Sequence, residues 1–310
     1  MSVLRNLLLA GSENPWLREQ ATRQRFIRRA VSRFMPGESF DEALEAAQRL
    51  RRQGMSTILT ILGENVSDRA EALTEVEHYD DVLTRLDGSG LDAEISVKLT
   101  HLGLDLDLDF TCENVEKIAR LAVARNTRLW IDMEGSAYTD QTIEVYRRVK
   151  ARVPNLGIAL QAYLRRTVAD LEALLPSGPA VRVVKGAYRE PDAIAFPRME
   201  DTCRSYLALC ERLLSPEARK AGAWLAVATH DPRMLGGVRD LARRQSVPND
   251  AFEFALLYGI RRDQQLELVR AGHRVRVLIS YGTHWFPWYM RRLAERPANL
   301  WFVARSAFAG

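Results

Sequence analysis

The chain has 310 residues, of which 47% are hydrophobic and 27% charged, and its 44 basic and 40 acidic residues give a formal net charge of +4. This balance is typical of a globular protein of one or two domains and excludes a disordered chain or a fibrous repeat. The basic surplus is small, and the arginines within 23–29 are expected on a solvated helix face. No nucleic-acid partner is therefore predicted.

The cysteines and the apolar segments indicate the cellular compartment. Cys112, Cys203 and Cys210 form no pattern typical of disulfides or of zinc, which favours a reducing cytoplasm. No stretch approaches the roughly 18 apolar residues of a membrane-spanning helix. The apolar segment 7–10 is too short for the core of a signal peptide, so we expect no export. The prediction is a cytoplasmic protein, and peripheral contact with the inner face of the cell membrane stays open.

The N-terminal part of the chain is expected to be helical. Residues 1–34 have a helical pattern, and Ser39 precedes Glu42 by three positions, which is the signature of a capping box. A helix over 40–53 should follow this cap. We therefore predict additional N-terminal helices over 1–54, ahead of a single barrel domain over 55–310.

From residue 56 onward, short apolar runs rich in β-branched residues alternate with longer stretches of helical period. The helical stretches include 114–125, 140–152 and 231–244. Eight apolar runs recur about every 31 residues. They are Ser56–Leu62, Ala93–Leu99, Leu129–Met133, Gly157–Tyr163, Ala180–Val184, Trp224–Ala228, Phe252–Leu257 and Val275–Ile279.

This alternation predicts an α/β protein built from βαβ units, because parallel strands need crossover helices between them. Eight such units over about 250 residues match a TIM-type (β/α)8 barrel. An open doubly wound sheet is the alternative. The glycines at 88 and 90 lack the third glycine of a dinucleotide fingerprint and do not form a P-loop, so a Rossmann domain is not expected.

In a barrel the chemistry is found at the carboxyl ends of the strands. Polar and ionisable residues follow nearly every apolar run of this sequence. Lys98, Asp132 and Arg182 lie within the runs themselves, where unpaired charges are unfavourable. We expect these charges to be paired with one another or with a ligand, which makes them candidates for a functional site.

Several chemistries remain open on the residues alone. Arg291 and Arg292 on the last helix suit a small carboxylate, because guanidinium groups bind carboxylates in a bidentate manner. Lys98 is a candidate Schiff-base nucleophile. A divalent metal is a further candidate, and either chemistry would make the chain a barrel isomerase or lyase that acts on a small anion. The candidate metal ligands are Asp132, Glu134, His230 and Glu253.

The sequence also predicts where two groups of ring-containing side chains lie. His78 and His273 are expected at the surface, since they fall in helical or loop contexts. The aromatic residues Trp285, Phe286 and Trp288 are expected either to line a pocket or to form a hydrophobic patch for a membrane or a partner.

Six motifs, in this order and with this spacing, together resemble the proline dehydrogenase family from about residue 29 to the C-terminus. They are Ile131–Glu134, Arg182–Tyr188, Ala228–Asp231, Phe252–Phe254, Leu257–Gly259 and Tyr289–Pro297. The resemblance implies a distorted (β/α)8 barrel that depends on FAD. The length is similar to that of the single-function bacterial members, so we expect no fused aldehyde dehydrogenase or DNA-binding module.

The resemblance also implies an activity. It is the oxidation of L-proline to Δ1-pyrroline-5-carboxylate by hydride transfer to flavin N5, the first step of proline catabolism, with a quinone as the electron acceptor. Asp132 and Arg182 would be catalytic, and Glu64 would act as a gate that pairs with Arg291. The substrate-binding residues would be Lys98, Tyr188, Leu257, Leu278, Arg291, Arg292 and Glu295. The cofactor-binding residues would be Met133, Gln161, Arg182, Lys185, Gly186, Ala187, Thr229 and His230.

The sequence departs from the family at three positions. Leu278 stands where the family has a tyrosine that contacts the proline ring, Ser280 stands in place of a proline, and Ala255 replaces a frequent glutamine near the flavin. L-Proline is the expected substrate. A substituted or larger-ring analogue, such as hydroxyproline, pipecolate or an N-alkyl proline, is the alternative, because one pocket contact is worth about 1–3 kcal/mol of preference.

Overall fold

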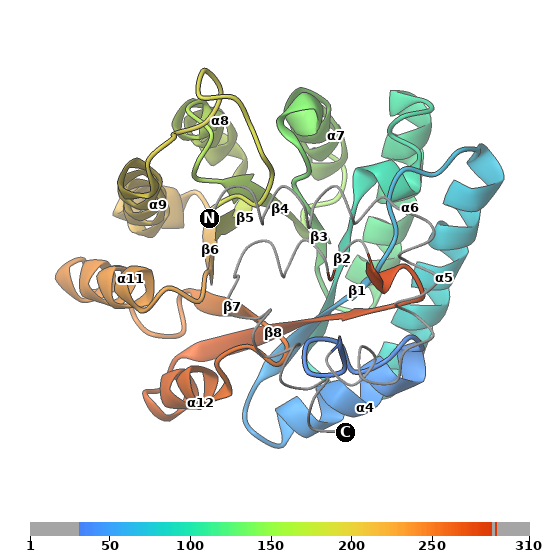
Figure 1. The fold of residues 1–310 in the computed structure, drawn as a ribbon, viewed down its shortest axis with the longest axis horizontal. Helices are drawn as coiled ribbons and strands as arrows, with labels where there is room; N and C mark the ends of the chain where they lie inside the picture. The colour runs from blue at the N-terminus through green and yellow to red at the C-terminus, as the bar shows by residue number, and fades with distance from the viewer. Residues whose placement is uncertain (1–30, 287–288, 290–310) are drawn as a thin grey trace, which may run out of the picture.

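A computed structural model describes residues 31–286 and residue 289 of the chain. Its eight strands form one closed barrel in which each strand pairs in parallel with the next along the chain and β8 pairs with β1 (Figure 1). The strands are β1 (Ser56–Ile61), β2 (Ala93–Val97), β3 (Leu129–Ile131), β4 (Leu156–Gln161), β5 (Ala180–Val184), β6 (Trp224–Ala228), β7 (Glu253–Leu257) and β8 (Arg274–Tyr281). The predicted barrel is confirmed, and the open doubly wound sheet is excluded.

Helices surround the barrel, and each buries an apolar face against the strands or a neighbouring helix (Figure 1). They are α4 (Phe40–Arg51), α5 (Arg69–Asp87), α6 (Leu108–Ala124), α7 (Thr139–Lys150), α8 (Thr167–Leu174), α9 (Met199–Leu214), α10 (Pro216–Lys220), α11 (Pro232–Arg244) and α12 (Arg262–Arg270). None of the helices within the described residues is long and apolar enough to cross a membrane.

Helix α4 begins at the predicted capping box. The Ser39 hydroxyl accepts a hydrogen bond from the Glu42 amide at 3.3 Å, and the Glu42 carboxylate accepts one from the Ser39 amide at 3.0 Å. The bond from the Ser39 backbone holds the pKa of Glu42 below its usual value. The helix ends at Arg51, two residues before the predicted end. It packs on β1 and β8. The division into 1–54 and 55–310 stays a prediction.

The strand ends differ from the predicted runs in a way that affects the site. Strand β2 stops at Val97, because a 3₁₀ turn over Leu99–Leu102 follows at once, and β3 stops at Ile131. Lys98 and Asp132 therefore follow their strands rather than lying within them, whereas Arg182 is inside β5. Strand β8 is longer than predicted and includes both Leu278 and Ser280.

The predicted surface positions of the two histidines are wrong. His273 is only 9% exposed, and its ring meets the edge of Phe254 at 5.1 Å between centroids. His78 is half-buried, and its Nε2 lies 2.8 Å from the Tyr281 hydroxyl. Both rings are turned inward by the elements that carry them, and burial lowers the pKa of each.

The aromatic residues near the C-terminal end of the described chain are also buried. Trp285 and Phe286 are 2% and 5% exposed, and the Trp285 indole donates a hydrogen bond to Glu38 at 3.0 Å. These two side chains therefore do not form an exposed hydrophobic patch. Trp288 lies outside the described residues.

The two ends of the barrel interior are polar, and the layer between them is mostly apolar. Residues two apart on a strand face the same side, so one set of every strand points inward. The middle layer is filled by Ile58, Trp130, Ala180, Ala226 and Ala255.

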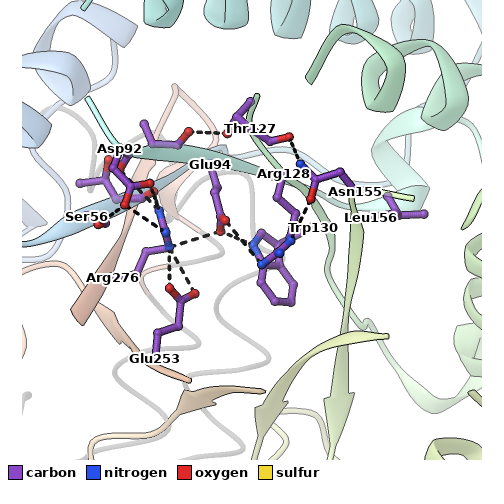
Figure 2. A network of polar contacts seen from close by, with 12 residues as sticks. Ser56, Asp92, Glu94, Thr127, Arg128, Trp130, Asn155, Leu156, Glu253 and Arg276 are labelled. Carbon is purple, nitrogen blue, oxygen red and sulfur yellow. Dashed lines mark hydrogen bonds and ion pairs between the residues drawn. The ribbon is translucent and has the colours of Figure 1, made fainter. Parts of the chain in front are cut away.

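At the amino ends of the strands, Arg276 joins a buried polar network (Figure 2). Its Nε lies 3.0 Å from an oxygen of Glu253 and 3.3 Å from an oxygen of Glu94, and its Nη1 lies 3.0 Å from Asp92. Arg276, Glu94 and Glu253 are all buried. We call this group of four side chains the floor network. It separates the apolar layer from solvent at this end.

Candidate active site

A cavity of about 330 Å³ opens at the carboxyl ends of the strands, opposite the floor network. Many of the predicted site residues line it together. They are Lys98, Asp132, Met133, Gln161, Arg182, Lys185, Gly186, Ala187, Tyr188, Thr229, His230, Leu257 and Leu278. The polar members come from different strands, and closure of the barrel is what brings them into one place.

The centre of the cavity wall is an ion pair between Asp132 and Arg182. Arg182 Nη2 donates to Asp132 and also, at 3.0 Å, to the Ser96 hydroxyl, which itself donates to Asp132 at 2.8 Å. The Arg182 side chain is 5% exposed and that of Asp132 is 22% exposed. A buried guanidinium is tolerated here because a carboxylate and a hydroxyl satisfy one of its nitrogens.

Two polar atoms of the cavity wall are buried without a hydrogen-bond partner among the described residues. They are Nη1 of Arg182, a donor, and Oε1 of Gln161, an acceptor. The other end of the Gln161 amide is fixed, since its Nε2 donates to the carbonyls of Met133 at 3.2 Å and Glu134 at 3.0 Å. Buried polar groups are nearly always paired in folded proteins, so these two atoms are available to hydrogen-bond a ligand or a water in the cavity.

Glu134 is buried behind this wall. Its carboxylate accepts hydrogen bonds from the backbone amide of Thr100 at 3.1 Å and from the Thr100 hydroxyl at 2.7 Å. Burial nevertheless raises the pKa of Glu134 above its usual value. These bonds tie the loop after β2 to the loop after β3, and they hold the Glu134 carbonyl where Gln161 contacts it.

A second polar region lies where β5 and β6 end. Lys185 Nζ donates to Asp231 at 2.7 Å, and Asp231 accepts the Arg233 amide at 3.0 Å as the N-cap of α11. Although burial opposes it, hydrogen bonds from Arg233 and Lys185 hold the pKa of Asp231 far below its usual range. An ammonium beside a helix N-terminus favours an anionic group such as a phosphate.

Gly186 follows Lys185 in a conformation that only glycine adopts easily, with φ at +113°. A Cβ atom built on it would lie 2.2 Å from the Tyr163 ring. The backbone of this loop therefore passes the aromatic ring closely and needs a residue without a side chain.

The imidazole of His230 is oriented by the backbone of β7. Its Nε2 accepts the Leu257 amide at 3.0 Å, so the neutral ring carries its proton on Nδ1. This contact joins the carboxyl ends of β6 and β7, and it places a hydrogen-bonding ring beside Thr229 in the cavity wall.

One of the predicted site residues that the structure describes is not brought to this cavity. Glu64 lies half-buried in the loop after β1 and does not line the cavity. Arg291, Arg292 and Glu295 lie outside the described residues.

The metal hypothesis is wrong for the four ligands that it named. Glu253 is bound to Arg276 in the floor network, at the opposite end of the barrel from His230. Across residues 31–286 and 289, no group of three or more histidine, cysteine, aspartate or glutamate side chains is arranged to hold a metal.

The sequence did not single out Ser96, which is buried and contacts both members of the central ion pair. A signal was present, because Ser96 lies two positions from Lys98 and from Glu94 and must face the same way in the strand. Thr60 and Ser280 are register partners on β1 and β8, and both line the cavity. Neither was predicted as a site residue.

A closed (β/α)8 barrel with ionisable side chains gathered in a cavity at the carboxyl ends of its strands defines a barrel enzyme. The family model for proline dehydrogenase matches residues 43–305. The chain is 36% identical over 304 residues to proline dehydrogenase 1 of Bacillus subtilis strain 168, with 98% of each chain covered. It is 35% identical to the proline dehydrogenase of Deinococcus radiodurans, covering 99% of this chain and 98% of the relative.

Solved structures agree on the fold. The structure of proline utilization A from Bdellovibrio bacteriovorus is similar with a TM-score of 0.80 at 24% identity, over 87% of this chain and 33% of that one. The structure of a mutant of proline utilization A from Bradyrhizobium japonicum is similar with a TM-score of 0.74 at 23% identity, over 91% of this chain and 32% of that one. This chain thus spans about a third of those longer proteins. It belongs to the proline dehydrogenase family, whose oxidoreductases act on the CH–NH group of proline in the first step of proline catabolism.

Proposed function

We propose that this chain oxidises L-proline to Δ1-pyrroline-5-carboxylate with FAD bound in the cavity at the carboxyl ends of the strands. The observation that carries the proposal is the pair of unsatisfied buried atoms, Arg182 Nη1 and Gln161 Oε1, in the wall of one cavity. A flavin presents both acceptors and an N–H donor along its polar edge, so its chemistry matches a donor and an acceptor held in the wall of one cavity.

The residues present fit FAD in other respects as well. Gln161 and the Met133 backbone would meet the polar edge of the ring, and Arg182 would lie near N5. The glycine-containing loop of Lys185, Gly186 and Ala187 would hold the ribityl and phosphate groups. Thr229 and His230 would meet the pyrophosphate. A lysine beside a glycine in a tight loop suits phosphate oxygens, because the backbone can approach closely and the ammonium compensates their charge.

The chemistry that FAD supplies when bound is the acceptance of a hydride from the ring carbon next to nitrogen, which leaves a C=N bond and releases the amine proton to solvent. The chain provides position and charge. Arg291 and Arg292 would clamp the substrate carboxylate, with Glu295 beside them and Glu64 as a gate. Positive neighbours such as Lys98 and Arg182 disfavour the protonated amine, and only the neutral amine can lose hydride. Tyr188, Leu257 and Leu278 would form the wall around the ring.

Anaerobic reduction of the purified protein tests this function. The protein is expected to be yellow, and proline should bleach its flavin absorbance. Hydroxyproline, pipecolate and N-methylproline, tested at equal concentration, would show whether the departures at Leu278 and Ser280 favour another ring. A colourless protein that does not take up FAD would contradict the cofactor assignment. A yellow protein that no cyclic amino acid bleaches would contradict the activity.

Replacing Gly186 with alanine is expected to weaken FAD binding about tenfold. A non-glycine residue at positive φ is disfavoured by roughly 1–2 kcal/mol, and the added Cβ would also displace the Tyr163 ring. The dissociation constant of FAD, from fluorescence quenching, checks this. Gly236→Ala in α11 is the matched control, because no atom lies within 4 Å of its added Cβ and no change in FAD affinity is expected.

Arg291→Met is expected to raise the KM for proline on the order of 100-fold, because one partner of a buried charge pair is worth about 2–5 kcal/mol. The spectrum of the bound flavin should stay unchanged. Steady-state kinetics together with the visible spectrum of the variant provide the measurement. Loss of flavin from the variant would show that this arginine serves the cofactor and not the substrate.

Leu278→Tyr is expected to shift the preference toward unsubstituted proline by about tenfold, since one pocket contact contributes about 1–3 kcal/mol. The measurement is the ratio of kcat/KM for proline to that for hydroxyproline. Leu278→Met keeps an apolar wall of similar size and should leave the ratio near its original value. An unchanged ratio in the tyrosine variant would remove this position from the specificity argument.

The electron acceptor and the location are further parts of the proposal. We place the enzyme in the cytoplasm, in keeping with three free buried cysteines. A quinone is proposed to take the electrons, which would require contact with the inner face of the membrane. Turnover that is accelerated by a water-soluble quinone, compared with oxygen alone, supports this acceptor.

A further inference from the structure

Trp130 lies between the two polar ends of the barrel. It is the middle residue of β3 and is fully buried. The Arg182 guanidinium carbon lies 5.3 Å from the centroid of its ring, and its indole N–H donates to Glu94 at 2.6 Å. The indole therefore contacts the floor network through its edge and the active-site arginine through its face.

Glu94 is itself held firmly. Arg276 Nε lies 3.3 Å from one of its oxygens, and Arg128 Nη1 lies 3.6 Å from the other (Figure 2). The neighbouring carboxylate of Glu253 shares Arg276 with it at 3.0 Å. These contacts fix the acceptor to which the indole N–H is bound.

The strand beside Trp130 leaves room for the indole. Its register partner on β4 is Gly157, and a Cβ on that glycine would lie 2.4 Å from the indole ring. Gly157 has an ordinary backbone angle, so the absence of a side chain serves this close approach and not a turn. The indole is thus confined by β4 as well as by Glu94.

The contacts of Arg182 explain why such confinement is needed. Both of its hydrogen bonds, to Asp132 and to Ser96, come from the same nitrogen, Nη2. Bonds from a single nitrogen restrain the plane of the guanidinium less than bonds from two of its nitrogens would. Packing on an aromatic face fixes that plane, because the cation is attracted to the ring. The direction of the unsatisfied Nη1 then follows from the position of the indole.

We infer that Trp130, oriented by Glu94, is the positioning residue that sets the direction of Arg182 Nη1 in the cavity. The inference rests on the proposed function, in which Arg182 lies beside the flavin. It extends the site to the opposite end of the barrel, because the floor network reaches Arg182 through one side chain.

The test compares Trp130→Leu and Trp130→Phe with Trp224→Leu. Trp224 is a matched control, since the guanidinium groups that pack on its ring belong to Arg128 and Arg274 and not to Arg182. Their central carbons lie 6.0 and 5.2 Å from the ring centroid. Each variant is loaded with FAD. The midpoint reduction potential of the flavin, its visible spectrum and the rate of anaerobic reduction by proline are then measured, together with the melting temperature of the protein without FAD.

Trp130→Leu is expected to make the reduction potential more negative and to slow reduction by proline on the order of 10- to 100-fold, because a misdirected group near the reacting atoms has effects of this size. Trp130→Phe keeps an aromatic face beside Arg182 but loses the hydrogen bond to Glu94, so its reduction potential should lie between those of Trp130→Leu and the unmodified protein. Trp224→Leu should lower the melting temperature and leave potential and rate unchanged. If Trp130→Leu does not fold, Gly157→Ala displaces the indole while retaining every polar side chain, and the same shift is expected.

Two results would overturn the inference. One is a flavin reduction potential in Trp130→Leu equal to that in Trp224→Leu, and the other is a reduction potential in Trp130→Phe that is no closer to that of the unmodified protein than in Trp130→Leu. Failure of the proposed function is a separate outcome. It would show in the unmodified protein, as absent FAD or as flavin that proline does not bleach.

Discussion

Replacing Arg182 with methionine is expected to slow the reduction of bound flavin by proline on the order of 100- to 1000-fold, which is the effect of removing one preorganised donor from a site where charge develops. The guanidinium supplies a donor of the cavity wall, Nη1, that is buried without a partner among the described residues. Its positive charge also disfavours the protonated amine of the substrate. Both contributions disappear with methionine, which has a similar length and no charge.

Stopped-flow absorbance under anaerobic conditions measures this rate directly, without the step that returns electrons to an acceptor. Arg274→Met is the control, because this arginine packs on Trp224 at the amino end of the barrel. The flavin of this variant should be reduced by proline at the original rate. The flavin of the Arg182 variant should remain bound, held by the Lys185 loop and by Gln161. A rate within threefold of the unmodified protein would contradict the assignment of Arg182.

Removing Arg182 also leaves Asp132 without its cation, so part of any loss comes from this carboxylate. The double variant Arg182→Met with Asp132→Asn separates the two effects, because the amide still accepts the Ser96 hydroxyl and carries no charge. If the slow rate persists in the double variant, the missing donor is its cause. Recovery toward the original rate would assign the defect to the unpaired Asp132.

The barrel was predictable because its signal is repeated along the chain. The run at Ala180–Val184 is bounded by the turn residues Gly178 and Pro179 on one side and by Lys185 on the other, and the predicted limits match β5. Limits were less accurate where a tight turn follows a strand directly. Leu99 continues the apolar run of β2 but starts a 3₁₀ turn, and the composition alone does not distinguish these two conformations.

The central part of the site was predictable for a related reason. Since parallel strands end at one face, Lys98, Asp132 and Arg182 had to meet if the barrel closed. The rule also explains the error over Glu253, which is the first residue of β7 and not its last. Leu257 at the cavity lies four positions further along the strand, a distance of about 13 Å. The position of Glu253 near the start of its apolar run already indicated the amino end of the strand, where it cannot reach the cavity.

The floor network was not predictable from local pattern. Arg276 and Glu94 are far apart in the sequence, and each taken alone looks like an ordinary charged residue near the start of a strand. The burial of His273 was missed for the same reason, because the ring is covered by Phe254 from the preceding strand. The partner of His273 becomes visible only after the register of β7 and β8 is known, and that of Arg276 also needs the pairing of β8 with β1 and of β1 with β2.

Arg276→Met is expected to lower the free energy of unfolding by about 3–5 kcal/mol at pH 8, which is typical for breaking a buried ion pair from one side. The guanidinium is buried among Glu253, Glu94 and Asp92, and its removal leaves Glu94 and Glu253 buried without their shared cation. Methionine fills much of the space, so the remaining charge and not a cavity should dominate the loss.

The pH dependence follows from the direction of the Glu94 pKa. Burial raises this pKa, and the neighbouring Glu253 raises it further, against the opposing effect of Arg276. Without Arg276, the pKa of Glu94 in the folded protein should rise more. A carboxyl whose pKa is higher in the folded than in the unfolded protein makes its full contribution to the free energy of unfolding below the unfolded pKa. That contribution is lost as the pH rises through the folded pKa. The deficit of the variant should therefore be large at pH 8 and smaller at pH 5.

Urea unfolding of the unmodified protein and the variant at both pH values measures this difference. Arg276→Met combined with Glu94→Gln and Glu253→Gln removes the charges of the three buried members of the floor network and keeps almost the same shape, and it should recover most of the stability at pH 8. Buried ion pairs are often replaced by neutral groups without loss, so recovery is the physical expectation if charge is the cause. An equal deficit at both pH values, with no recovery in the triple variant, would mean that packing of the arginine stem stabilises this end of the barrel, and not the compensation of its carboxylates.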